Sequence, residues 1–142
     1  MGTYASQQDL VDRFGQDELI RLTNPDDLQA TTIDTARLDR AIADAEASVD
    51  GYLAGPYDTP LDPVPRVVTK ITCDLARFEL YDEHAPEQIT ARKEDALKFL
   101  RSVARGDVTL GSSASGEQVE RDDQANIESG GRVFGRDGGG FL

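Results

Sequence analysis

The chain has 142 residues, of which 27 are acidic and 15 are lysine or arginine, so its formal net charge is −12. This length favours one domain with a modest core. The acidity argues against a protein that binds nucleic acid by neutralising phosphates, since such binding requires clustered Lys and Arg. An acidic wall would instead let DNA pass without sticking, because like charges repel. Composition alone does not separate that interpretation from an ordinary, strongly solvated surface.

Two short helices are predicted at the start of the chain. Ser6 is a good N-cap for the first, which carries Leu10 and Phe14, and Gly15 ends it. The second spans residues 17–22 and has acidic residues in its first turn. Both are too short to be stable alone. We therefore expect them to pack as a cap across the longer helices that follow.

Residues 33–81 contain the two long helical patterns around which the fold is organised. Asp34 is placed to cap the first pattern, and Gly55 follows where a helix commonly ends. Apolar residues recur every three or four positions in both patterns, which places them on one face of each helix. They are Leu38, Ile42, Ala45, Val49 and Leu53 in the first, and Val67, Val68, Ile71, Leu75 and Phe78 in the second. Two such faces joined by a short connector predict a helical hairpin.

The connector between these helices, residues 55–65, is rich in proline. Each proline lacks an amide donor and pushes the preceding residue toward extended geometry, so no helix passes through. Pro65 stands at a plausible first position of the second helix. We expect Leu61 and Val64 to be buried beneath this elbow, whose prolines set the angle between the two helices.

The other face of the first long helix is polar. It is expected to face water and to form local ion pairs among Arg37, Asp39, Arg40, Asp44, Glu46 and Asp50. Four alanines keep this helix thin enough for close neighbours, either in the same chain or in another subunit: Ala41, Ala43, Ala45 and Ala47.

A third long helix is predicted from Glu87, with Gly106 as its stop. Arg101 and Arg105 stand in its last turns, where positive charge complements the helix dipole. Residues 108–110 could add one short strand. The predicted fold class is all-α: a small helical bundle built on a long helical hairpin, with short N-terminal helices and a flexible C-terminal tail.

We divide the chain into a helical domain, residues 1–110, and a Gly-rich tail, residues 111–142. Composition favours a disordered tail with incidental apolar residues. The alternative is a segment that orders against a partner. Its candidate partner-binding anchors are Arg132, Val133, Phe134, Arg136, Phe141 and Leu142.

The sequence offers no constellation for catalysis. Cys73 is the single cysteine and His84 the single histidine, too few for a zinc site, and nothing marks them as partners. We expect Cys73 to be a half-buried helix residue. The acidic residues follow no calcium-loop spacing, and the glycines of the tail form no phosphate-binding loop. We therefore expect neither an enzyme nor a bound cofactor or metal. No apolar run is long enough to span a bilayer, so we expect no membrane contact.

The order of these features resembles the small neck or head-completion proteins of Mu-like tailed phages and prophages. The most specific stretch is Tyr57 with Pro60-Leu61 and Val64-Pro65, followed by Asp74-Leu75-Ala76-Arg77-Phe78-Glu79-Leu80-Tyr81. The resemblance covers residues 4–111, and the tail matches through Phe134 and Gly140-Phe141-Leu142. Further matching stretches are Tyr4-Ala5-Ser6, Asp9-Leu10, Arg13-Phe14-Gly15, Glu18 to Thr23, Ile33-Asp34, Ala41 to Ala45, Val49 to Leu53, Leu97 to Leu100, Ala104-Arg105-Gly106 and Leu110-Gly111.

Such proteins are similar in fold to head–tail connector adaptors, α-helical subunits that form a ring beneath the portal, commonly of twelve copies. The resemblance implies a virion structural protein without catalytic residues. Its partners would be further copies of itself, the portal protein and a neck or tail-terminator protein, with genome DNA passing through the lumen unbound. It would occupy the virion neck, and the host cytoplasm during assembly. The alternative is a helical binding or regulatory module that captures a partner peptide.

Overall fold

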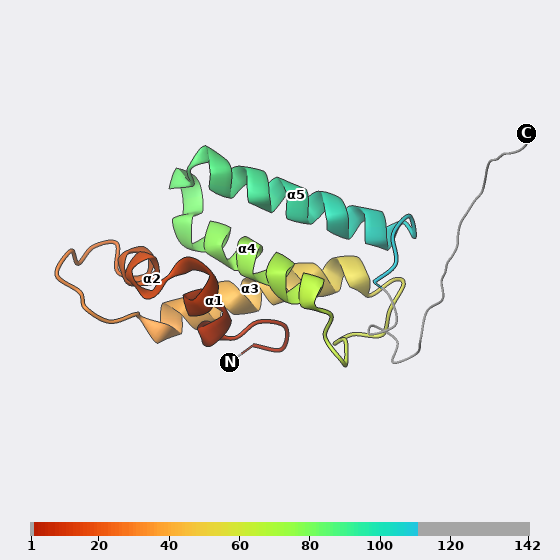
Figure 1. Cartoon of the computed structure of the whole chain (residues 1–142), viewed down its shortest axis with the longest axis horizontal. Coiled ribbons are helices and arrows are strands. Elements are labelled where there is room, and N and C mark those ends of the chain that lie inside the picture. The colour runs from red at the N-terminus through yellow and green to blue at the C-terminus, as the bar shows by residue number, and fades with distance from the viewer. Residues whose placement is uncertain (1, 111–142) are drawn as a thin grey trace, which may run out of the picture.

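Three long helices form the body of the molecule (Figure 1). The structure is a computed structural model that describes residues 2–110, except for the side chain of Glu83. The elements in chain order are α1 (Gln7–Phe14), α2 (Gln16–Thr23), α3 (Thr35–Leu53), α4 (Arg66–Tyr81), the 3-10 turn η1 (Asp82–His84) and α5 (Glu87–Ala104). The predicted all-α class is confirmed. No strand occurs within residues 2–110, so the short strand predicted at residues 108–110 is wrong.

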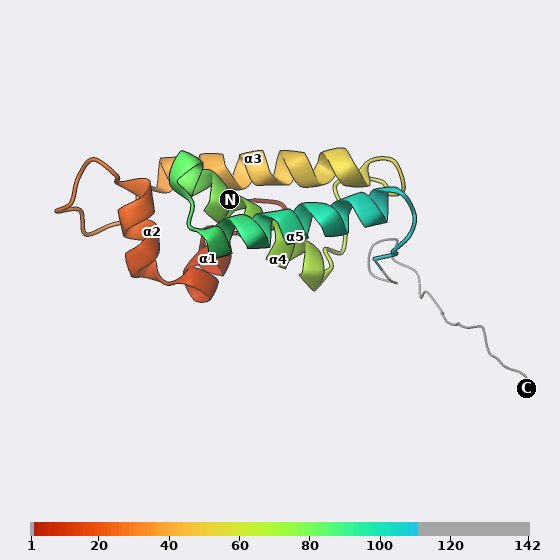
Figure 2. The same cartoon turned by 90° about the horizontal axis from the view of Figure 1, so that it is seen from above.

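The helical hairpin is formed by α3 and α4, and α5 packs on both of them (Figures 1 and 2). Asp34 caps α3 as predicted, because its carboxylate accepts a hydrogen bond from the Arg37 amide at 3.2 Å. The three helices enclose a continuous core, in which each buried leucine or valine stabilises the fold by roughly 1.5–3 kcal/mol. Fully buried members include Leu38, Ile42, Val49, Leu53, Val68, Ile89, Leu100 and Val103.

The short helices α1 and α2 lie across the hairpin and contact α3 and α4, as predicted. Ser6 and Asp9 form a capping box at the start of α1. Gly15 separates the two helices with φ at +93°, a conformation that residues with side chains rarely adopt. The sharp turn at this glycine lets Leu10 and Leu19 both reach the core.

The elbow between α3 and α4 belongs to the core at one point. Leu61 is only 2% exposed, as predicted, whereas Val64 is half-buried rather than buried. Pro65, predicted to be the first helical residue, is instead the N-cap of α4, which begins one residue later at Arg66. Its lack of an amide does no harm there, because the N-cap amide makes no bond within the helix.

After α5 the chain returns to the elbow. Gly106, with φ at +85°, follows the end of the helix as predicted. The Leu110 amide then donates a hydrogen bond to the Tyr57 hydroxyl at 2.9 Å, and the Leu110 side chain is buried. Because the Tyr57 hydroxyl satisfies this amide, residues 108–110 need no strand partner.

Candidate functional surfaces

The N-terminal segment is fastened to the hairpin by Tyr4, which is 3% exposed. Its hydroxyl donates to the carboxylate of Asp50 and accepts from the Leu61 amide at 3.0 Å. Burial raises the pKa of Tyr4 to about 12, and the hydrogen bond to Asp50 acts in the same direction. One phenol therefore joins the start of the chain, the end of α3 and the elbow.

Two further acidic residues of α3 hold the same segment. The Glu46 carboxylate accepts from the amides of Tyr4 at 2.6 Å and Ala5 at 3.2 Å. Asp39 accepts from Nε2 of Gln7 at 2.8 Å, and this bond lowers the pKa of the Asp39 carboxyl. The expectation that the polar face of α3 simply meets water is therefore wrong at Asp39, Glu46 and Asp50. Their acceptors satisfy donors of a segment that lacks helical partners of its own.

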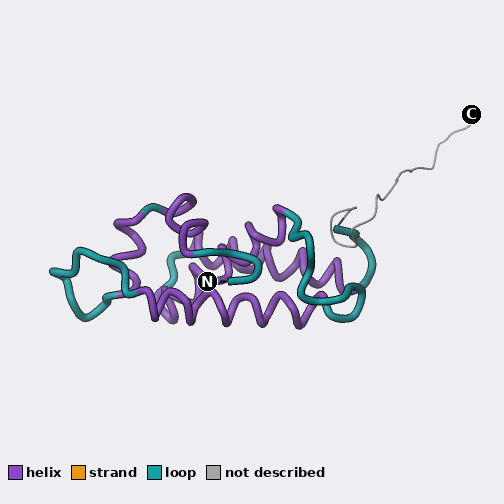
Figure 3. The backbone as a smooth tube through the Cα atoms, turned by 90° about the horizontal axis from the view of Figure 1, so that it is seen from below, coloured by secondary structure: helices purple, strands orange, loops and turns teal. Residues whose placement is uncertain are grey.

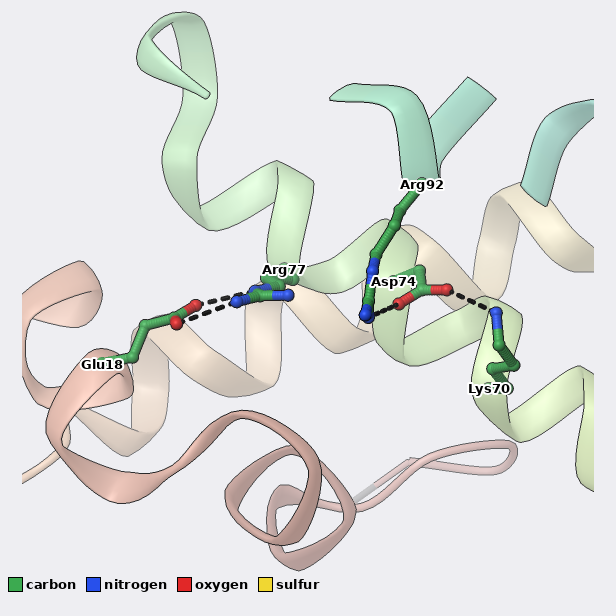
Figure 4. Close-up of polar contacts among 5 residues, drawn as sticks. All are labelled: Glu18, Lys70, Asp74, Arg77 and Arg92. Atoms are coloured by element: carbon green, nitrogen blue, oxygen red, sulfur yellow. Dashed lines mark hydrogen bonds and ion pairs between the residues drawn. The ribbon is translucent and has the colours of Figure 1, made fainter. Parts of the chain in front are cut away.

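A bidentate ion pair joins α2 to α4 (Figure 4). Nε and Nη2 of Arg77 lie 2.7 and 2.9 Å from the two carboxylate oxygens of Glu18. The same guanidinium stacks over the Phe14 ring, 4.2 Å from its centroid. The hydrogen bonds to Glu18 raise the pKa of Arg77 further above its ordinary value. Arg77 thus fixes both short helices on the hairpin.

A buried carboxylate joins α4 to α5 (Figure 4). Asp74 is 3% exposed, and its two oxygens lie 3.0 Å from Nζ of Lys70 and 3.4 Å from Nη1 of Arg92. A buried charge is tolerated only when it is paired. Asp74 is therefore a structural residue that fastens α5 by its Arg92 to the hairpin.

The residues considered for chemistry are not assembled into a site. Cys73 is 0% exposed rather than half-buried, and burial raises its thiol pKa to about 12, so it is not an activated nucleophile. His84 is exposed in η1. Within the described range of the chain, no group of three or more His, Cys, Asp or Glu residues is placed to hold a metal ion. None of the described helices is long and apolar enough to cross a bilayer.

The alanines of α3 divide between the interior and the surface. Ala41 and Ala45 are buried against the rest of the chain, whereas Ala43 and Ala47 are exposed. On the side of α3 that carries Ala41 and Ala45, the small side chains allow close packing within the chain. The other side of α3 is open to solvent in the single chain.

The connector at residues 24–34, between α2 and α3, projects from one end of the molecule (Figure 3). It carries Leu28, which is 93% exposed. Its base is held by Asn24, whose side-chain amide donates to the carbonyls of Ile20 and Thr32, both at 2.9 Å. A single exposed leucine is ordinary on a protein surface and does not by itself define an interface.

A hollow of about 400 Å³ lies at the opposite end, on the elbow; we call it the elbow hollow. Prolines and one tyrosine form an apolar wall, although the lining as a whole exposes more polar than apolar surface. Two of the lining residues are exposed carboxylates. Its lining residues are Ala54, Gly55, Pro56, Tyr57, Asp58, Pro60 and Asp62. The six predicted tail anchors, between Arg132 and Leu142, lie outside the described residues.

Comparison with known proteins identifies the family of this chain. A model of the family described as "Bacteriophage Mu, Gp36" matches residues 4–129. The chain belongs to this family. The Mu-like prophage FluMu protein gp36 of Haemophilus influenzae is 35% identical over 136 residues, covering 96% of this chain and 95% of the relative. Gene product J of Escherichia phage Mu is 34% identical over 140 residues, covering 98% and 99%.

The Gp36 match includes all five helices and the residues that join them. Asp74 and Arg77 lie within the stretch that carried the resemblance to Mu-like phage proteins, and both make the ion pairs that hold the bundle together. The match to the family model ends at residue 129, before the predicted tail anchors begin. The match therefore spans most of residues 1–110 and part of the predicted tail, and does not test the roles of Arg132 to Leu142.

The hydrogen bonds of Tyr4 and the ion pairs of Asp74 and Arg77, which we call the polar joints, were not predicted from the sequence. One of them nevertheless has a signal in the sequence. Asp74 stands within residues 71–76, which are otherwise apolar or small and are all buried. A charged residue in such a run indicates a paired buried charge. Tyr4 left no comparable signal, because its partners are more than forty residues away in the chain.

Proposed function

We propose that this chain is a virion structural protein: a head–tail connector subunit that assembles as a ring below the portal and links head to tail without catalysis. Membership of the phage Mu Gp36 family carries the proposal, because its model covers nearly all of the helical domain. The all-α construction supports it, since connector adaptors of long-tailed phages are helical subunits.

The distribution of polar groups supports a role in assembly rather than in chemistry. The buried Asp74 and the half-buried Arg77 are each held by an opposite charge from another helix. The buried Cys73 thiol is held in its protonated form at neutral pH. The polar groups of the interior are thus committed to holding helices together, which suits a rigid building block.

The surface charge suits a protein around a DNA channel. The whole chain has a formal net charge of −12, and an acidic lumen repels the phosphate backbone. The proposed partners are further copies of this chain, the portal protein above and a neck or tail-terminator protein below. The proposed location is the virion neck, reached from the host cytoplasm during assembly.

Assembly of the purified chain tests this proposal. We expect sedimentation velocity and negative-stain electron microscopy to show closed rings at high concentration or after addition of the portal protein. Heterologous contacts between identical subunits close into such rings when the rotation between neighbours permits it. A chain that stays monomeric at all concentrations, with and without portal protein, would contradict the proposal and favour a helical module that captures a peptide.

A further inference from the structure

The elbow hollow combines two kinds of surface. Pro56, Tyr57 and Pro60 provide apolar and aromatic faces, and Asp58 and Asp62 place two carboxylates on the same rim. Neither carboxylate forms an ion pair with any residue in the range 2–110. An aromatic side chain flanked by cations would complement both features, since guanidinium groups pair with carboxylates through a planar fork of donors.

Leu110, the last described residue, lies beside the hollow. Its amide donates a hydrogen bond to the hydroxyl of Tyr57, a lining residue. About twenty residues then precede Arg132, and a chain of that length reaches roughly 70 Å when extended. The distance from Leu110 to the hollow is only a small part of this extended length.

The sequence that follows has the required character. Residues 132–136 read Arg-Val-Phe-Gly-Arg, with one aromatic side chain and an arginine at each end. The other apolar anchors, Phe141 and Leu142, are separated from Arg136 by Asp137 and three glycines, and no cation adjoins them. An acidic rim therefore favours residues 132–136 over the second pair of anchors.

We propose that residues 132–136 bind in the elbow hollow of their own chain. Phe134 packs on the apolar wall, and the two flanking arginines pair with Asp58 and Asp62. A tether of about twenty residues holds the segment near the hollow at an effective concentration on the order of millimolar, so weak contacts suffice for binding within one chain. The inference does not depend on ring assembly and concerns the single chain.

Paramagnetic broadening in the full-length protein tests this contact. Ser129→Cys supplies a labelling site for a nitroxide, because the native Cys73 is 0% exposed and does not compete for the reagent. In dilute ¹⁵N-labelled protein, we expect the amide signals of Gly55, Tyr57 and Asp58 to lose most of their intensity. Signals of the distant 24–34 connector should keep theirs and serve as the internal reference.

Matched substitutions make the result specific. Phe134→Ala should abolish the broadening at the elbow, whereas Phe141→Ala should leave it unchanged. The double variant Asp58→Lys with Asp62→Lys should also abolish the broadening, and adding Arg132→Glu with Arg136→Glu should restore it. Broadening that is absent in the parent, or that survives Phe134→Ala, would overturn the proposal.

A mixing experiment separates contact within a chain from contact between chains. Spin-labelled protein without ¹⁵N is mixed with ¹⁵N-labelled protein that carries no spin label. We expect no broadening at the elbow in this mixture. Broadening there would show that the segment binds a neighbouring copy, which would overturn binding within one chain while leaving ring assembly open.

Discussion

Two connectors of similar length leave α3 at its two ends and differ in their relation to the core. Residues 24–34 project into solvent, with Leu28 at 93% exposure, and are held by side-chain hydrogen bonds at their base. Residues 54–65 bury Leu61 at 2% exposure, and two tyrosine hydroxyls tie them to distant segments. The Tyr4 hydroxyl accepts from the Leu61 amide, and the hydroxyl of Tyr57, within the connector, accepts from the Leu110 amide. Both connectors contain proline and acidic turn residues, so their local composition does not explain the difference.

The difference teaches that long-range partners decide which connector becomes part of the core. Tyr4 reaches the elbow from the first residues of the chain, and Tyr57 joins it to the residues that follow α5. Three segments distant in sequence thus converge at one end of the hairpin. The 24–34 connector has no comparable convergence among the residues described, which leaves its tip free for contacts with other molecules.

The largest expected effect comes from placing a charge beneath the elbow. Leu61→Asp should lower the free energy of unfolding by about 3–5 kcal/mol, because it buries an unpaired carboxylate where a leucine filled the core. Urea denaturation followed by circular dichroism measures the loss. The matched control is Leu28→Asp in the other connector, which should unfold like the parent. Equal stability of the two variants would refute the contrast between the connectors.

Removing one hydroxyl at the convergence point should have the next largest effect. Tyr4→Phe leaves the Leu61 amide and the Asp50 carboxylate without this partner, at a cost of about 1–3 kcal/mol. Tyr52→Phe is the control, because the Tyr52 hydroxyl makes no hydrogen bond within residues 2–110. If both variants lose the same stability in thermal melts, the hydroxyl of Tyr4 does not anchor the elbow.

The same hydroxyl predicts a pH dependence. The pKa of Tyr4 is about 12 in the folded chain and 10.0 ordinarily, so the folded state holds this proton more tightly. Its contribution to stability is complete below about pH 10 and is lost as the pH rises toward about 12. The gap in unfolding free energy between the parent and Tyr4→Phe should therefore stay constant to about pH 10 and then narrow. A gap that widens above pH 10 would contradict this assignment.

The smallest effect is expected at the far side of the elbow. Tyr57→Phe removes the acceptor of the Leu110 amide and should cost about 0.5–1.5 kcal/mol, since this amide is only partly buried. The Leu110 amide should exchange its hydrogen faster, because the free energy of the opening that permits exchange should fall by a similar amount. Amides inside α3 should keep their protection. Unchanged exchange at Leu110 would show that the bond to Tyr57 does not hold this segment.

Periodicity and capping residues were sufficient to predict the helices. The apolar spacing of α3 and α4, the cap at Asp34 and the stops at Gly15 and Gly106 are local signals, and the structure confirms them. Helix ends shifted by a residue or so, as at Pro65, because a cap and a first helical position have similar preferences.

The polar joints could not be predicted in the same way. Glu46 and Asp50 have the spacing of a solvated helix face, and only the return of the N-terminal segment gives them buried partners. Residues 108–110 have the composition of a strand, but the Tyr57 hydroxyl, distant in sequence, satisfies the Leu110 amide. Such contacts depend on the packed hairpin, so they follow from the tertiary structure and not from local pattern.

Deletion of this gene from the phage that carries it tests most directly the proposed role in joining heads to tails. Electron micrographs of the lysate should show heads and complete tails that accumulate unjoined, and a plasmid copy of the full chain should restore joined, infectious particles. Leu28→Asp and other folded variants can then be compared in the same assay. Joined infectious particles at normal yield without the gene would contradict the account.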